Sequence, residues 1–296
     1  MRTIMYRLSF LSPLWSDARR RGRLLVIFAA VLWSMAGVFI KSLSLPPETI
    51  AFYRFLFAAA FFFFFLKPRD IILDRRVFFS ITTYVIATGS FVWANKLTTA
   101  ANAIVLQYTA PIYIYALIPL LFREKISRPG VLALCGGMSG IGVIFIGSVG
   151  EPEMAGIWVA LFSGLFFALY IVNLRFLSGT SPTYLVLINN LGGVVLFLPM
   201  VAQHLYLLPA QLVALICMGV FQFGGAYFVF SKGVESTPLQ EASLLLLLEP
   251  VLNPLWVNLV VGEVPSMATA IGGGVILLSL GVYYRFAALS SEPLGS

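Results

Sequence analysis

Ten long apolar stretches constrain this chain more than any other feature. They cover approximately residues 24–41, 49–67, 77–95, 99–121, 129–148, 155–174, 182–201, 210–231, 238–261 and 265–286. A helix needs about 20 apolar residues to cross a hydrocarbon core of ~30 Å, and in lipid a helix satisfies its own backbone hydrogen bonds. With 60% hydrophobic and 10% charged residues, the chain exceeds what a water-soluble core requires. The sequence therefore predicts an all-α polytopic membrane protein with ten transmembrane helices.

The positions of lysine and arginine predict the orientation of these helices. If residues 1–23 form a cytoplasmic N-terminal segment, all 19 basic residues except Lys41, Arg54 and Lys96 lie on the cytoplasmic side. Both termini, including a C-terminal tail at 287–296, are then cytoplasmic. A cleaved signal peptide is the alternative for residues 1–23, but the first apolar stretch lacks an A-x-A type cleavage site. We expect a multi-pass protein of the bacterial cytoplasmic (inner) membrane, whose net charge of +7 contacts anionic lipid and not nucleic acid.

Two segments of the sequence repeat each other. "TTAANAIVLQYTAPIYIYALIPLLFREKIS" aligns without gaps with "TPLQEASLLLLLEPVLNPLWVNLVVGEVPS". The alignment pairs Pro111 with Pro250 and Glu124 with Glu263, at an offset of 139 residues. The two copies, 24–148 and 155–286, hold five spans each, and an odd number makes the second copy enter the membrane from the opposite side. The sequence thus predicts two inverted five-helix repeats, which are typical of secondary transporters with a midplane substrate site.

The repeated segments also carry a family resemblance. "VLWSMAGVFIKSL" and "LEPVLNPLWVNLVVGE", together with the two copies, resemble the drug/metabolite transporter superfamily in its EamA-type ten-span group, over about residues 24–286. "VLWS" and "QYTAP" are similar to bacterial exporters of aromatic amino acids, which carry tryptophans where this chain has Ala110 and Phe167. The resemblance therefore implies a gradient-driven exporter of small amino-acid-like zwitterions, aromatic and other apolar amino acids included, that works by alternating access.

Polar and aromatic residues inside the spans are candidates for a central substrate cavity, because a lipid-facing helix surface should be apolar. Tyr84 and Thr88 lie on one face of the third span, and Gln107 and Tyr108 lie on one stripe of the fourth. The candidate substrate-binding residues are Trp33, Ser34, Tyr84, Thr88, Trp93, Gln107, Tyr108, Tyr170, Asn189, Gln222 and Tyr227. For each of them, a hydrogen bond between helices or a place in an interfacial aromatic belt is the competing interpretation.

Two charged residues within the spans also require an explanation. Glu249 precedes Pro250, which removes a backbone donor and predicts a bent, locally open helix, and Pro111 occupies the matching position in the first repeat. Three roles of Glu249 stay open: a gate or helix anchor, which the resemblance favours, a counter-charge for a cargo ammonium group, and a proton site. For Arg54 we expect a side chain that extends to the outer head groups, with a carboxylate-attracting position in an outer vestibule as the alternative.

Missing motifs disfavour several other functions. One histidine and two cysteines cannot assemble a clustered metal site, so we expect no metal and no cofactor. We expect no enzyme and no ATP-driven pump, because the chain lacks the H-E-x-x-H, G-x-S-x-G and Walker A patterns. The alternative function is a multidrug exporter of organic cations, which Glu249 and aromatic rings could bind. A nucleotide-sugar or organophosphate carrier is less expected, since it would need several deep cations.

The expected partners follow from this assignment. They are a small-molecule substrate and membrane lipids, and no nucleic acid. The sequence leaves open whether the protein acts as a monomer.

Overall fold

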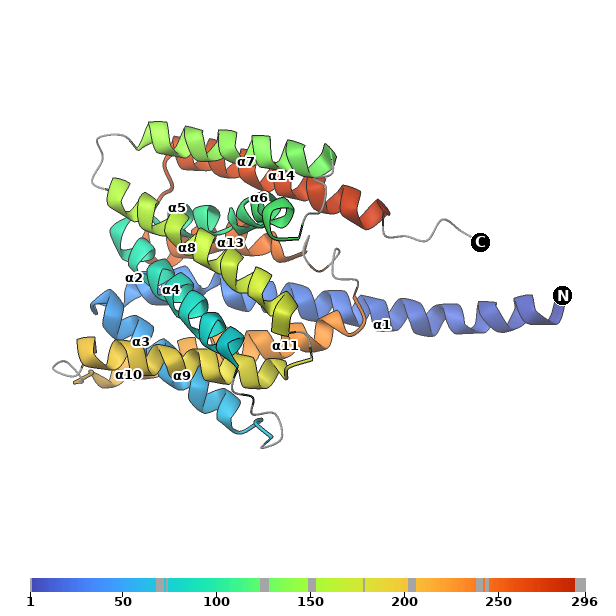
Figure 1. Ribbon diagram of the computed structural model, residues 1–296, viewed down its shortest axis with the longest axis horizontal. Coiled ribbons are helices and arrows are strands. Elements are labelled where there is room, and N and C mark those ends of the chain that lie inside the picture. Colours follow the sequence, from blue (N-terminus) through green and yellow to red (C-terminus); the bar gives the residue numbers. More distant parts are fainter. Residues whose placement is uncertain are drawn as a thin grey trace.

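The computed structural model describes residues 2–67, 72, 74–122, 128–148, 153–177, 179–201, 206–237, 242 and 245–290. Within these residues every regular element is helical, and α1 (Arg2–Ser34) projects beyond the bundle that the other helices form (Figure 1). The first half continues with α2 (Ala36–Ser42), α3 (Pro47–Phe63), α4 (Arg75–Leu97), α5 (Ala100–Gln107), α6 (Ala110–Phe122) and α7 (Arg128–Gly147). The second half contains α8 (Met154–Leu174), the short 3-10 helix η2 (Arg175–Leu177), α9 (Pro182–Val201), α10 (Pro209–Ile216), the π-helical η3 (Cys217–Gly225), α11 (Ala226–Val234), α13 (Leu248–Val261) and α14 (Met267–Ser290).

Helices occupy each of the ten predicted ranges, although some spans consist of several elements. The first span divides into α1 and α2, the fourth into α5 and α6, and the eighth into α10, η3 and α11. Six helical stretches within the described residues are long and apolar enough to cross a membrane: Ala18–Ser42, Arg75–Leu97, Met154–Leu177, Pro182–Val201, Pro209–Val234 and Met267–Phe286. Two more apolar helices, Val131–Gly147 and α13, are shorter.

Local sequence accounts for several helix ends. Asp74 precedes α4, and its side chain accepts a hydrogen bond from the backbone N–H of Arg76 at 2.9 Å. Thr99 caps α5 in the same way, at 3.1 Å from the N–H of Asn102. Such caps satisfy backbone donors that the first turn of a helix leaves free. At the other end of α13, Gly262 adopts a φ of +78°, a conformation that glycine reaches without steric cost.

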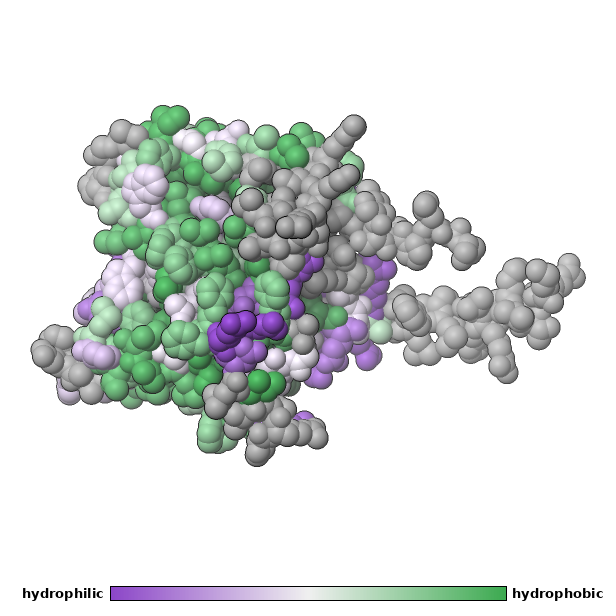
Figure 2. Space-filling model, viewed as in Figure 1, coloured by the Kyte–Doolittle hydropathy of each residue, from purple (hydrophilic) through white to green (hydrophobic). Residues whose placement is uncertain are grey.

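The outer surface of the bundle is apolar. Large hydrophobic side chains are exposed on many helices, among them Phe78 (71%), Ile146 (75%) and Leu259 (74%). Figure 2 shows a mostly hydrophobic face, with hydrophilic residues gathered mainly toward the end of the bundle from which α1 projects. Exposed apolar patches of this extent mark a surface that water does not cover, as a membrane protein requires.

Helices from the two halves of the chain pack against each other in pairs. α4 packs against α8, α1 against α11, α3 against α9, and α7 against α14. α7 and α14 lie side by side at one edge of the bundle (Figure 1). The core between the halves contains large, fully buried side chains such as Phe55, Ile104 and Ile157. The two halves therefore form one packed structure.

Glycines set the distance between α7 and α14. A Cβ atom on Gly140 would lie 2.5 Å from the carbonyl oxygen of Gly272, and one on Gly272 would lie 2.6 Å from that of Gly140. Gly136 faces Ser279, and Gly147 faces Ala268, so the two helices run antiparallel. Small residues at such a crossing let two membrane helices approach closely.

An ion pair joins helix ends that are distant in sequence. Lys41, in the last turn of α2, pairs with Glu263, which follows α13, and donates to the carbonyl of Thr98 at 2.8 Å. Glu263 also accepts a hydrogen bond from the N–H of Ala100 at 2.6 Å. Both charged side chains are largely buried, with 16% and 21% exposed. The pair therefore ties together the ends of α2, α4, α5 and α13.

We expect Glu263→Gln to lower the thermal stability of the protein. The substitution leaves the Lys41 ammonium group without a counter-charge, which should cost about 1–3 kcal/mol. Glu235→Gln is the matched control, because Glu235 pairs with Lys232 on the surface, where both are more than half exposed and a pair contributes roughly 0–1 kcal/mol. Thermal unfolding in detergent measures both variants, and equal losses would contradict the role assigned to the Lys41–Glu263 pair.

Candidate substrate site

The predicted gating residues lie at two helix breaks. Tyr108 and Thr109 separate α5 from α6, just before Pro111. Leu247 forms a turn before α13, just before Pro250. Tyr108 and Leu247 differ by the 139 residues of the sequence repeat, so the two breaks correspond. The interruption predicted from Pro250 is present, because a proline cannot donate to the preceding turn and clashes with it.

Tyr108 connects the two breaks. Its hydroxyl lies 2.7 Å from Oε2 of Glu249 and 3.1 Å from the carbonyl oxygen of Leu246. That carbonyl lies four residues before Pro250, and is therefore the one that proline leaves without a helical donor. Glu249 thus has a hydrogen-bond partner from the other half of the chain, as expected for an acidic group inside a membrane span.

Arg54 does not extend to the head groups, so that expectation is wrong. Its side chain is only 8% exposed, and among the described residues it is the one charged side chain that is buried. Its guanidinium carbon lies 5.1 Å from the centroid of the Phe223 ring, and its charge interacts with Tyr84 and Glu249. Nε and Nη1 have no hydrogen-bond acceptor in the described part of the chain. The reason is packing: α3 lies between α4, α9 and η3, which enclose the guanidinium before it can reach a head group.

Tyr84, which interacts with Arg54, contacts further phenol and amide groups. The Tyr84 hydroxyl donates to Oδ1 of Asn190 at 3.5 Å, and the Tyr84 and Tyr170 rings lie 5.2 Å apart. Asn189 donates to the Tyr170 hydroxyl at 3.5 Å. We call this set the Arg54 cluster; it consists of Arg54, Tyr84, Tyr170, Asn189, Asn190 and Phe223, from α3, α4, α8, α9 and η3.

The Arg54 cluster has the chemistry of a site for a carboxylate. A guanidinium presents several donors in a fixed plane, and a carboxylate can accept two of them at once. A buried cation without acceptors is destabilising, so an anionic ligand that supplies acceptors would bind with a large gain. The neighbouring aromatic rings offer apolar surface to the rest of such a ligand.

Four more of the candidate residues lie near this cluster or at its margin. Thr88 lies beside Tyr84, and Tyr227 interacts with Tyr84 and Tyr170 while its ring meets Phe62 edge-on at 5.6 Å. Tyr108 reaches the cluster through Glu249, whose charge interacts with Arg54. Trp93 packs on the Phe197 ring, at 5.5 Å between centroids.

The remaining candidates connect helices elsewhere. The carbonyl of Ser34 accepts from the Asn253 side chain at 2.9 Å, and its hydroxyl lies 3.0 Å from Nε1 of Trp256. Gln222 donates to the carbonyl of Trp33 at 3.1 Å, while its Oε1 has no partner in the described part of the chain. These contacts hold α1 against α13 and η3.

Gln107 also makes a contact between helices. Its amide donates to the Ser163 hydroxyl at 2.9 Å, which in turn donates to the carbonyl of Ala87 at 2.8 Å. This chain of bonds joins α5, α8 and α4. The predicted role of Gln107 in binding cargo stays a prediction.

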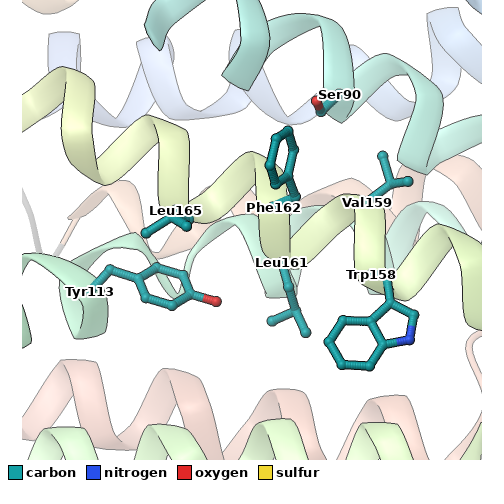
Figure 3. A pocket seen from close by; sticks show the side chains of 7 residues that line it. All are labelled: Ser90, Tyr113, Trp158, Val159, Leu161, Phe162 and Leu165. Carbon is teal, nitrogen blue, oxygen red and sulfur yellow. The ribbon is translucent and has the colours of Figure 1, made fainter.

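A groove on the side of the bundle is separate from these residues. It is lined by Ser90, Tyr113, Trp158, Val159, Leu161, Phe162 and Leu165 from α4, α6 and α8 (Figure 3). Trp158 and Phe162 are 57% and 47% exposed, and the polar side-chain groups are the Ser90 and Tyr113 hydroxyls and the Trp158 indole N–H. An open apolar groove of this kind suits lipid chains better than a zwitterion, so we place the candidate site at the Arg54 cluster.

The sequence interpretation missed Arg54, Asn190 and Phe223 as site residues. A signal for Arg54 was present, because it is the single cation placed away from the ends of a predicted span and intramembrane ionisable residues are usually functional. Asn190 directly follows the candidate Asn189, but adjacent residues on a helix face different directions. Phe223 could not be told from the chain's 26 phenylalanines by sequence alone.

Comparisons with known proteins agree with this architecture. The sequence pattern of the EamA-like transporter family matches residues 20–146 and again 154–285. An "Uncharacterized transporter" of Archaeoglobus fulgidus is 26% identical over 280 residues, 92% of this chain and 99% of that protein. The "Uncharacterized inner membrane transporter YicL" of Salmonella typhimurium is 26% identical over 288 residues, 88% of this chain and 94% of that protein. One crystal structure, 19% identical, shares the fold with a TM-score of 0.67, covering 93% of this chain and 100% of that one.

Proposed function

Because this chain belongs to the EamA-like transporter family, whose pattern matches both of its halves, it is a multi-pass membrane transporter, and we propose that it exports small amino-acid-like zwitterions. The cargo would include aromatic and other apolar amino acids. Transport would be driven by gradients, and the two halves would alternate in opening a central site to either side of the membrane.

The observation that carries this proposal is the buried, unsatisfied guanidinium of Arg54. Two of its nitrogen atoms lack an acceptor in the described residues, and the side chain is only 8% exposed. A cargo carboxylate would supply these acceptors. A purely cationic drug would meet repulsion from Arg54 instead, so the same observation disfavours the exporter of organic cations.

The rest of a zwitterion finds suitable partners around Arg54. Phenol and amide oxygens of Tyr84, Tyr170 and Asn190 can accept from an ammonium group, and the faces of Tyr170 and Phe223 can receive its cation or an apolar side chain. Nucleotide sugars carry at least two phosphate charges, for which one buried cation is a poor match.

The proposal includes ten spans in two inverted repeats, with both termini in the cytoplasm and the protein in the inner membrane. Separate family matches at 20–146 and 154–285 support two copies. The helix pairs support a two-fold relation between the repeats, because exchanging the repeats converts the α4–α8 contact into the α1–α11 contact and leaves the α3–α9 and α7–α14 contacts in place. The equivalent helices α7 and α14 run antiparallel, which supports inversion. A basic residue begins α4 and another lies in the last turn of α11, at predicted cytoplasmic ends.

Uptake into proteoliposomes tests the proposal. We would measure labelled phenylalanine together with two analogues, phenethylamine, which lacks the carboxylate, and 3-phenylpropionate, which lacks the ammonium group. UDP-glucose would represent the nucleotide sugars. Saturable phenylalanine transport is expected, with competition by 3-phenylpropionate stronger than by phenethylamine, because Arg54 recognises the carboxylate. Protein-free liposomes provide the background.

Two outcomes would contradict the proposal. Saturable transport of phenethylamine without transport of phenylalanine would identify an exporter of organic cations. Transport of UDP-glucose alone would indicate a carrier of phosphate esters and would require cations other than Arg54.

A further inference from the structure

We infer that Glu249 is a proton-binding site that couples proton movement to transport, through the hydrogen bonds between Tyr108 and the broken helix at Pro250. The inference rests on the proposed transport function, and extends it to the source of energy. At the helix break before Pro250, the Tyr108 hydroxyl has fewer hydrogens to donate than acceptors within reach.

Tyr108 has one hydroxyl hydrogen and two acceptors within reach. They are Oε2 of Glu249 at 2.7 Å and the carbonyl oxygen of Leu246 at 3.1 Å. When Glu249 is ionised, the hydrogen goes to the carboxylate, because a charged acceptor forms the stronger bond. The Leu246 carbonyl then loses its hydrogen bond from Tyr108, and Pro250 has no N–H to replace it. Loss of a hydrogen bond at a partly buried carbonyl is destabilising.

A proton on Glu249 removes this conflict. The protonated carboxyl group donates to the Tyr108 oxygen, which is both donor and acceptor. The Tyr108 hydrogen is then free to bond the Leu246 carbonyl, and every group of the chain Glu249, Tyr108, Leu246 is satisfied. Proton binding therefore strengthens the contact between the α5–α6 break and the start of α13, which belong to different halves of the chain, and proton release weakens it.

The charged and titratable groups that face this chain fit linked binding of a proton and cargo. Arg54, on α3, interacts with Glu249, and Tyr284, on α14, interacts with Tyr108. While Arg54 holds no cargo, its positive charge favours the ionised form of Glu249. A carboxylate bound to Arg54 would cancel that effect and favour the protonated form. Cargo and proton at this site are thus energetically linked, and linkage of this kind is reciprocal.

The test measures proton flux and carboxyl protonation separately. Proteoliposomes loaded with a pH-sensitive dye would receive a phenylalanine gradient, and a second assay would follow exchange of labelled for unlabelled phenylalanine without any gradient. Wild type is expected to move protons with phenylalanine. Glu249→Gln, whose amide can donate to Tyr108 but cannot release a proton, is expected to exchange phenylalanine while proton movement falls to background. Glu235→Gln, at an exposed position, is the matched control and should keep the proton signal.

A cargo-independent readout separates this inference from the transport proposal. Infrared difference spectra across a pH titration should show a carboxylic acid C=O band that is lost in Glu249→Gln and shifted in Tyr108→Phe, which removes its hydrogen-bond partner. If phenylalanine is not transported but this band titrates, the cargo assignment fails and the proton site stands. If the band does not change in Glu249→Gln, or if this variant moves protons like wild type, the inference is overturned.

Discussion

Replacing Arg54 with methionine should abolish transport of carboxylate-bearing cargo while leaving the protein at least as stable as wild type. Truncating one member of a buried charge pair costs 2–5 kcal/mol or more, which corresponds to a loss of roughly 30-fold or more in affinity. Stability should not fall, because replacing an unsatisfied buried charge by an apolar side chain of similar length is often neutral or favourable. Phenylalanine binding, proteoliposome transport and thermal unfolding in detergent measure the three quantities.

The different effects expected on transport and on thermal stability distinguish cargo binding from a structural role. If Arg54 served mainly to hold α3 against η3, Arg54→Met would lower thermal stability and transport together. Arg54→Lys should retain part of the affinity, since an ammonium group keeps the charge and loses the planar arrangement of donors. Lys232→Gln is the surface control, and should leave phenylalanine affinity unchanged, because Lys232 pairs with Glu235 at an exposed position outside the Arg54 cluster.

Two neighbouring glycines of α7 should respond to alanine in opposite ways. In Gly140→Ala the new methyl group would lie 2.5 Å from the Gly272 carbonyl oxygen and 2.7 Å from the side chain of Ile276. The helices must separate, and overpacking of this kind costs typically about 1–3 kcal/mol. In Gly142→Ala nothing lies within 4 Å of the new methyl group, and alanine in place of glycine favours a helix by about 0.5–1 kcal/mol.

Thermal unfolding of the two variants checks this prediction. We expect a lower midpoint for Gly140→Ala and an equal or higher midpoint for Gly142→Ala. Gly272→Ala, on the other side of the crossing, should behave like Gly140→Ala. If both α7 variants changed the midpoint in the same direction, the close approach of α7 and α14 at Gly140 would not be the stabilising contact that we describe.

The sequence predicted the helical architecture well because its signals are local and repeated. Apolar runs located helices in all ten ranges, and Pro111 and Pro250 marked breaks that the structure contains. Caps at Asp74 and Thr99 also follow from neighbouring residues. Such features depend on chain chemistry within a few turns, so no knowledge of the distant parts of the fold is needed.

The candidate site could be predicted only in part. Tyr84, Tyr170 and Asn189 were identified from polarity inside a span, and the structure brings them together. Ser34 and Gln107 carried the same signal, yet their side chains bond to other helices. Polarity within a span requires a partner, but does not say whether that partner is cargo or another helix.

What the sequence by itself determined was the helical class, the duplication and the family, all of which rest on periodicity and on spacing along the chain. Only the tertiary structure decided the environment of Arg54 and Glu249. A long cationic side chain on an isolated helix can reach either the head groups or the interior, and α4, α9 and η3 decide between them by enclosing the guanidinium. Likewise, the hydroxyl of Tyr108 lies 138 residues from the carbonyl that it reaches. Contacts over that separation depend on how the two halves pack, which a local pattern does not contain.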